Sequence, residues 1–292
     1  MSRTLESMLP KLVVAPGFIL GFAFIYGFMI WNGVLSVSAS RMLPNYEFVG
    51  LAQFERLFEM ERWWVALKNL GIFALLYVGG ACVVGVLLAI FLDQKIRAEG
   101  ALRTIYLYPM ALSFVVTGTA WKWMLNPSLG LEKLMHDWGW TSFHFDWLVN
   151  TEMAIYCVVI AGVWQSAGFA MALFLAGLRG IDDSIIKAAQ VDGASLPRIY
   201  WRIILPSLRP VFFSTILVLS HLSIKSFDLV MALTNGGPGY STDVPATFMY
   251  AMSFTRGQVG LGAASATVML MTVAALVVPY LYSELRSKPH DR

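Results

Sequence analysis

Charged side chains are scarce in this sequence. Only 13% of its 292 residues are Asp, Glu, Lys or Arg, whereas 58% are hydrophobic. A soluble globular domain carries about 25% charged residues, because its surface faces water. The composition therefore excludes an ordinary soluble domain and is typical of a membrane protein. The net charge of +3 is too small to indicate a nucleic-acid-binding protein.

The sequence also lacks the motifs of common enzymes. No lysine follows a glycine, so the Gly-Lys-Ser/Thr end of a phosphate-binding loop is missing and we expect no ATP hydrolysis by the usual route. A His-Glu-x-x-His metalloprotease motif is absent as well. The only two cysteines, Cys82 and Cys157, fall inside apolar segments, which excludes a disulfide framework. We expect no catalytic residues and no cofactor bound by this chain.

Long apolar segments are what the sequence has in place of charge. A helix needs roughly 20 mostly apolar residues to cross a bilayer. Six segments reach that length, which predicts an all-α membrane protein with six transmembrane helices in a single domain over residues 1–292. The predicted spans are about 12–35, 69–92, 104–125, 153–178, 208–233 and 261–283.

The distribution of lysine and arginine predicts the orientation. Thirteen of them fall before residue 12, after residue 283, or in the loops 93–103 and 179–209, and six fall in the alternate loops. Positive charge accumulates on the cytoplasmic side of membrane proteins. We therefore expect both termini and the 179–209 loop to be cytoplasmic.

The polar segment between the fourth and fifth spans carries signals for two short helices. Asp182 and Asp183 can cap a helix start, and Gly193 can end that helix in a left-handed turn. Ser195 offers a second N-cap, and Pro206 is expected to stop the second helix. Isolated helices this short are marginal in water, so the pair is expected to dock on something.

The segment from Lys187 to Pro210, KAAQVDGASLPRIYWRIILPSLRP, resembles the signature loop of permease subunits in ATP-driven, binding-protein-dependent importers. In that family the loop forms short helices that sit in a groove of a separate ATPase subunit. One position departs from the pattern, since Lys187 stands where the family usually has Glu. The resemblance implies a coupling loop over 179–207, with coupling residues Lys187, Ala188, Ala189, Asp192, Gly193 and Ala194.

A second stretch, LTNGGPGYSTDVPATFMY from Leu233 to Tyr250, resembles the outer loop of the first permease subunit in sugar importers of the maltose and glycerol-phosphate type. This resemblance implies a bacterial inner-membrane protein that forms a heterodimer with a second permease. It also implies two ATP-binding subunits, which would hold ATP and Mg²⁺, and a soluble sugar-binding protein. The expected substrate is a mono- or disaccharide.

Polar residues within the predicted spans are candidates for a substrate path. Such groups are costly in a bilayer unless they face protein or water. In the fourth span an amide, a hydroxyl and an aromatic ring cluster, as a sugar ring would require. In the fifth span, His221, Lys225 and Asp228 share one helical face. The proposed path residues are Gln165, Ser166, Phe169, Ser223, Ser226 and Asp228.

Other interpretations of these residues stay open. Lys225 and Asp228 can form an ion pair inside the bundle, and the small residues of the fourth span can serve helix packing. A proton-coupled secondary sugar transporter using Lys225 and Asp228 is one alternative function, and a membrane scaffold without transport is another. His136 and His144 lie near Asp137 and Asp146, but their spacing fits no familiar metal motif. We expect surface polar residues there and no metal.

Overall fold

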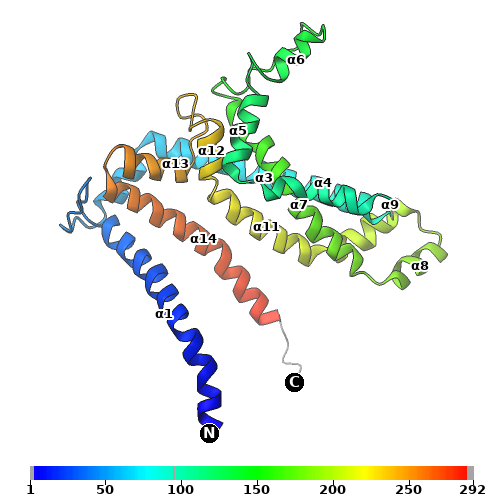
Figure 1. Cartoon of the computed structure of the whole chain (residues 1–292), viewed down its shortest axis with the longest axis horizontal. Helices are drawn as coiled ribbons and strands as arrows, with labels where there is room; N and C mark the ends of the chain where they lie inside the picture. Colours follow the sequence, from blue (N-terminus) through cyan, green and yellow to red (C-terminus); the bar gives the residue numbers. More distant parts are fainter. Residues whose placement is uncertain (1–2, 95, 288–292) are drawn as a thin grey trace. The chain divides into compact units, whose positions relative to one another are not determined.

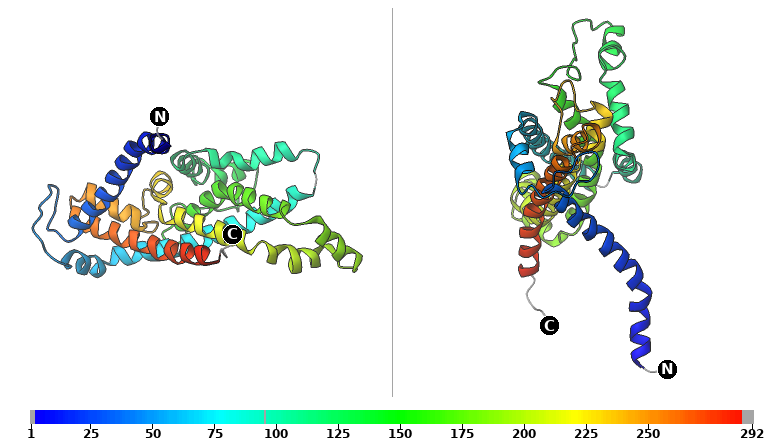
Figure 2. Two further views of the ribbon diagram at one scale, coloured as in Figure 1. Left: turned by 90° about the horizontal axis from the view of Figure 1, so that it is seen from below. Right: turned by 90° about the vertical axis from the view of Figure 1, so that its left-hand side faces the viewer.

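The computed structural model describes residues 3–94 and 96–287, and within these ranges the regular elements are all helices (Figures 1 and 2). The only extended pairing among the described residues is an isolated bridge between Ser38 and Phe48. The predicted all-α class is therefore confirmed. The helices are α1 (Arg3–Ser36), α2 (Ala52–Glu59), α3 (Glu61–Asp93), α4 (Glu99–Ala111), α5 (Phe114–Met124), α6 (Leu131–Asp137), α7 (Ala154–Arg179), α8 (Asp183–Val191), α9 (Leu196–Ile199), η1 (Tyr200–Ile204), α10 (Leu205–Ser207), α11 (Arg209–Ile224), α12 (Phe227–Leu233), α13 (Pro245–Tyr250), η2 (Ala251–Thr255) and α14 (Val259–Ser287).

The chain divides into two compact units by its internal contacts. The first contains the residues up to 61 together with 248–272, and the second contains 62–247 together with the residues from 273 on. The first unit holds α1 and α2, and the second holds most of the remaining helices. Both units draw on distant parts of the sequence.

Four helices of the described chain are long and apolar enough to cross a membrane by themselves. They are Val13–Ser36, Glu61–Asp93, Ala154–Arg179 and Val259–Tyr280. These agree with the first, second, fourth and sixth predicted spans. A fifth candidate is a bent pair, Leu196–Ser207 followed by Arg209–Ile224, with an angle of 63° between its parts.

The third and fifth predicted spans were wrong as continuous helices. Predicted span 104–125 is divided into α4 and α5 at Leu112 and Ser113, and predicted span 208–233 is divided into α11 and α12 at Lys225 and Ser226. The stop expected at Pro206 is met within one residue, since the helical run that contains it ends at Ser207 and the chain then bends by 63°. An average over about twenty residues cannot detect a two-residue interruption in an otherwise apolar stretch.

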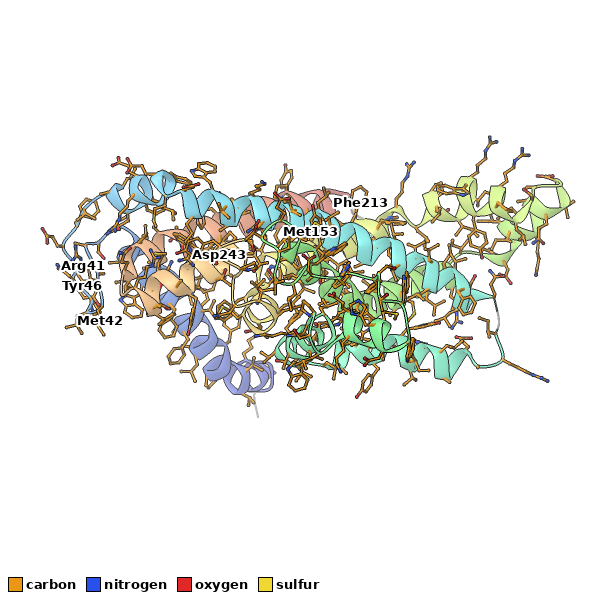
Figure 3. The ribbon with its side chains drawn as sticks, turned by 90° about the horizontal axis from the view of Figure 1, so that it is seen from above. Arg41, Met42, Tyr46, Met153, Phe213 and Asp243 are labelled. Atoms are coloured by element: carbon orange, nitrogen blue, oxygen red, sulfur yellow. The ribbon has the colours of Figure 1, made fainter. Side chains whose placement is uncertain are left out.

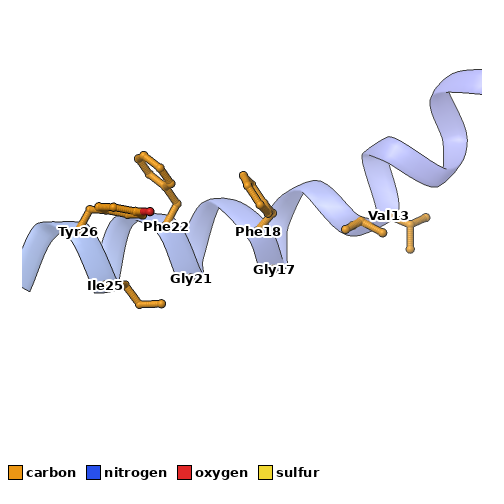
Figure 4. Close-up of a pocket in the computed structure, with 8 residues that line it drawn as sticks. Val13, Gly17, Phe18, Gly21, Phe22, Ile25 and Tyr26 are labelled. Atoms are coloured by element: carbon orange, nitrogen blue, oxygen red, sulfur yellow. The ribbon is translucent and has the colours of Figure 1, made fainter. Parts of the chain in front are cut away.

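The α1 helix is apolar along its whole membrane-length segment. None of the most apolar 18-residue stretch of this segment is buried in the structure. Figure 4 shows Phe18, Phe22 and Tyr26 projecting from the helix beside Gly17 and Gly21. A helix that is apolar all round is suited to lipid or to other apolar helices.

The core of the second unit is built around α7. Its membrane-length window is 67% buried, the highest share among the candidate spans. The helices α4, α5, α11 and α12 pack against it. Gly168 of α7 makes a close approach possible, because a β-carbon at this position would overlap the carbonyl oxygen of Tyr106 in α4. The two broken helices are thereby held against the most buried one.

Candidate substrate cavity and coupling loop

Two helix breaks, one between α4 and α5 and one between α11 and α12, lie near each other in the second unit. At the first, Ser113 takes an extended conformation and its hydroxyl accepts a hydrogen bond of 3.3 Å from the backbone N–H of Val116, which caps α5. The carbonyl of Leu112 leaves the helical pattern and accepts a 2.7 Å bond from Nε2 of Gln165. Non-helical backbone at membrane depth is tolerated where protein or a cavity satisfies it. Gln165 therefore supplies the hydrogen-bond donor that the Leu112 carbonyl lacks at the break.

The second break is joined to the first by close packing of α5 on α12. A β-carbon on Gly118 would lie 2.7 Å from that of Ala232, so only glycine allows this approach. Near this break, the hydroxyl of Ser223 donates 2.7 Å to the carbonyl of Ser220. Such side-chain bonds compete with the helical pattern of the backbone.

A cavity of about 460 Å³ opens between these breaks. The volume lies within the range of small-molecule sites, roughly 300–1,000 Å³. Both broken helices and α7 contribute to its wall. The lining residues are Met110, Leu112, Ser113, Phe114, Gln165, Ser166, Phe169, Val218, Leu222 and Asp228.

Four of the six proposed path residues line this cavity, namely Gln165, Ser166, Phe169 and Asp228. Ser223 and Ser226 lie outside its lining and are buried. Leu112 and Ser113 could not be predicted as lining residues, because their role depends on a break that hydropathy does not show.

The polar groups of the cavity are partly satisfied by protein. The Ser166 and Tyr77 hydroxyls share a hydrogen bond of 2.7 Å. Gln165 is 4% exposed, and its Oε1 atom has no hydrogen-bond partner among the described residues. A buried acceptor without a partner is costly, so this atom is available to a ligand hydroxyl or a water molecule.

The helical face predicted for His221, Lys225 and Asp228 is interrupted, because α11 and α12 are separate helices. Lys225 ends α11 and is exposed, whereas Asp228 lies in α12. Among the described residues, no ion pair within 4.0 Å joins Lys225 to Asp228. The interpretation of these two residues as a self-satisfied pair is therefore contradicted.

The loop between α7 and α11 has the predicted helix-turn-helix shape. The Asp182 carboxylate accepts a 2.8 Å bond from the backbone N–H of Ser184, which caps α8, and this bond lowers the pKa of Asp182. Gly193 ends the turn with φ of +77°. Ser195 occupies the second N-cap position, but its side chain makes no capping bond.

Every residue of α8 is exposed or half-buried in the structure. Lys187, Ala188, Asp192 and Gly193 are exposed, and Ala189 and Ala194 are half-buried. This surface includes the apolar side chain of Val191, which is 88% exposed. An amphipathic helix with an open face is suited to a groove on another protein.

The loop after α12 is held against α3. Asp243, labelled in Figure 3, is 1% exposed, and its carboxylate accepts a 2.7 Å bond from Arg62 Nε. The Arg62 guanidinium lies 4.2 Å from the centroid of the Tyr240 ring. Asn69 donates to the Asp243 carbonyl at 2.9 Å. Side-chain contacts from α3 therefore fix the part of this loop that contains Tyr240 and Asp243.

The histidines expected at the surface lie in the segment after α5. His136 is in α6 and His144 follows it, with ring centroids 5.9 Å apart. Asp137 pairs with Lys133 at 3.6 Å rather than with either histidine. Glu132, which was not among the predicted residues, lies 3.2 Å from His144.

The family model described as "binding-protein-dependent transport system inner membrane component" matches residues 81–287. The chain belongs to this family. The resemblance inferred from the loop after Lys187 is thus confirmed, and members of the family are transport subunits of the membrane.

Two curated relatives of this permease extend over nearly the same length. One is a probable ABC transporter permease protein of Pyrococcus horikoshii, 40% identical over 273 residues, which cover 93% of this chain and 94% of the relative. The other is the xylose/arabinose import permease protein of Haloferax volcanii, 35% identical over 268 residues, which cover 90% of this chain and 83% of the relative.

A solved structure shares the fold of the permease. It is that of a bacterial ABC transporter involved in the import of the acidic polysaccharide alginate, with a TM-score of 0.81, 22% identity and full coverage of both chains. At this identity the similarity concerns the fold alone.

Proposed function

We propose that this permease imports a neutral mono- or disaccharide as one half of a heterodimer with a second permease. Two ATPase subunits and a soluble sugar-binding protein complete the proposed assembly. The chain crosses the inner membrane six times, counting the two broken helices as spans, and both termini are cytoplasmic. The import of xylose and arabinose named for the Haloferax volcanii relative supports a sugar as substrate.

The cavity at the two helix breaks is the observation on which this proposal mainly rests. It offers the aromatic ring of Phe169, the amide of Gln165 and the hydroxyl of Ser166. A sugar ring has an apolar face that packs on aromatic groups and a rim of hydroxyls that needs hydrogen bonds. Transporters commonly place substrates where helices are discontinuous, since free backbone groups are found there.

The α8 helix is the proposed contact with the ATPase. ATP binding closes the ATPase pair, and α8 carries that motion through the turn at Gly193 into α11. The bent connection of 63° ahead of α11 joins this loop directly to a helix that lines the cavity. A shift of α8 would therefore change the cavity walls and switch access between the two sides. The exposed Lys187 faces this contact with a charge opposite to that usual in the family.

The coupling role is tested by Asp192→Ala and Gly193→Pro. Proline fixes φ near −65°, whereas Gly193 has φ of +77°, so the turn cannot keep its shape. We expect transport and substrate-stimulated ATP hydrolysis to fall while membrane insertion persists. Gly71→Ala is a matched control, because a β-carbon there meets no atom within 4 Å. Full transport by Gly193→Pro would contradict the coupling role.

The partner of α8 is tested by crosslinking from a cysteine at position 188 in the assembled transporter. We expect a product with the ATPase subunit. Crosslinks to lipid alone would contradict the proposal. The proton-coupled alternative predicts uptake that survives loss of the ATPase and collapses with an uncoupler. Family membership favours the ATP-driven mechanism.

A further inference from the structure

Three potential metal ligands converge in the segment that follows α5. Glu132 and His136 are four residues apart on α6, which places both side chains on one side of the helix. Beyond α6 the chain turns back at Gly139, whose φ is +95°, and returns with His144. One ligand atom from each of Glu132, His136 and His144 lies within 4.8 Å of the others.

Hydrogen bonds already orient these three side chains. His144 Nδ1 lies 3.2 Å from Glu132 Oε1, and the backbone N–H of Phe145 donates 3.2 Å to Glu132 Oε2. His136 Nε2 lies 2.7 Å from the carbonyl oxygen of Phe143. Since a carbonyl only accepts, this nitrogen carries the hydrogen and Nδ1 keeps the lone pair of the neutral ring.

The burial of the cluster leaves one side open. The Glu132 side chain is 14% exposed and that of His144 is 75% exposed. The two carboxylate oxygens of Glu132 face His144 Nδ1 and the backbone N–H of Phe145. A charged carboxylate beside two imidazoles, with access from solvent, has the chemical character of an open metal site.

We propose that Glu132, His136 and His144 bind a Zn²⁺ ion, with water in the remaining position. Two imidazole nitrogens and one carboxylate oxygen are ligands that zinc accepts in tetrahedral sites with an open position. Calcium and magnesium prefer oxygen ligands and are disfavoured by the two histidines. The Phe143 carbonyl acts as an outer-shell group, since a second hydrogen bond commonly orients a metal-bound histidine.

The bound ion would tie α6 to the returning segment. Without the ion, three hydrogen bonds join α6 to the returning segment, and His144 takes part in one of them, to Glu132. With the ion bound, Glu132 and His136 of α6 and His144 of the returning segment would all coordinate the same zinc. The segment between α5 and α7 would then be ordered by zinc. This inference is independent of the transported solute and of the ATPase.

Zinc binding is measured on the full-length protein, purified without a polyhistidine tag and treated with a chelator, by titration with ZnCl₂. We expect one saturable equivalent. His144→Ala and Glu132→Gln should each weaken zinc binding about tenfold or more. Removal of an outer-shell partner alone commonly costs that much affinity, and removal of a ligand should cost at least as much. His144 is exposed, so its replacement should leave the fold intact.

Asp137→Ala is the matched control, because Asp137 also lies on α6 but pairs with Lys133 instead of the histidines. Its zinc affinity should stay that of the unchanged protein. X-ray absorption of the zinc-loaded protein should show two imidazole ligands. Absence of saturable binding would overturn the proposal, and so would equal losses in Asp137→Ala and His144→Ala, which indicate adsorption to surface charge.

Discussion

Arg62 Nε lies 2.7 Å from Asp243 Oδ2, across 181 positions of sequence. The side chains of Arg62 and Asp243 are 14% and 2% exposed, so the pair is largely removed from water. The other carboxylate oxygen of Asp243 accepts a 2.5 Å bond from the Thr247 hydroxyl. The loop after α12 is therefore fixed to α3 by a largely buried ion pair.

Removing the carboxylate should destabilise this connection strongly. Asp243→Ala leaves a partly buried guanidinium without its charged partner, and such a loss costs about 3 kcal/mol. We expect a lower midpoint of thermal unfolding for the purified permease, together with reduced transport. Lys133→Ala provides the contrast, since its pair with Asp137 is 3.6 Å long and more than half exposed. That change should cost about 0.5 kcal/mol or less. Equal effects of the two substitutions would contradict the importance of the buried pair.

Close helix contact at Gly168 gives a second prediction. In Gly168→Ala the new methyl group would overlap the Tyr106 carbonyl, and backbone atoms cannot move aside cheaply. Overpacking of this kind costs about 1–3 kcal/mol. We expect lower thermal stability and a displaced α4, detectable as faster hydrogen exchange in residues 104–111. Gly79→Ala in α3 meets no atom within 4 Å and should be neutral or slightly stabilising. If both variants unfold at the same temperature, the packing argument is wrong.

Local features of the fold could be predicted from the sequence. The Asp182 cap and the left-handed turn at Gly193 involve neighbouring residues, so residue type alone indicates them. Apolar length likewise predicts four of the spans, because it too is a property of neighbouring residues. The α3 helix begins at Glu61, ahead of the predicted apolar span that starts at 69, because its first turns mix buried Trp63 with polar neighbours. When hydropathy is averaged over such mixed turns, the apolar signal falls below that of a span.

The contacts that shape the cavity could not be predicted. The break at Leu112 is stabilised by Gln165, which is 53 positions away, and no local pattern reports that bond. Gln165, Ser166 and Phe169 were selected for their chemistry, and the structure places them on one cavity wall. Ser223 and Ser226 were selected by helical spacing, which fails across the break after Ile224. Likewise, Glu132 joins the two histidines only through the fold.

The Tyr77–Ser166 hydrogen bond separates a structural role of Ser166 from a substrate role. Tyr77→Phe removes only the partner of the 2.7 Å bond, whereas Ser166→Ala also removes a hydroxyl from the cavity wall. If that hydroxyl contacts the sugar, Ser166→Ala should weaken apparent affinity about fivefold, corresponding to about 1 kcal/mol for one hydrogen bond. Tyr77→Phe should change affinity less. Measuring the concentration dependence of uptake distinguishes them, and identical values for the two variants would leave Ser166 a packing residue.

The Asp182 cap makes the stability of α8 depend on pH. The backbone N–H of Ser184 favours the ionised carboxylate and lowers its pKa. The contribution of this group is therefore complete above the ordinary aspartate pKa of about 3.9 and is lost as the pH falls through the lower value of the folded state. Asp182→Asn keeps a good capping group without a titrating proton, whereas Asp182→Ala removes the cap.

Hydrogen exchange of the first turn of α8 should therefore separate these variants. At neutral pH, Asp182→Ala should exchange faster than the unchanged protein, since the hydrogen bond that caps the first turn is lost. Asp182→Asn should match the unchanged protein. After correction for intrinsic rates, acidification to about pH 3 should reduce protection in the unchanged protein but not in Asp182→Asn. A parallel fall in ATPase coupling for Asp182→Ala alone would indicate that coupling requires an ordered α8. Normal coupling despite faster exchange would mean that the proposed contact with the ATPase orders α8 by itself.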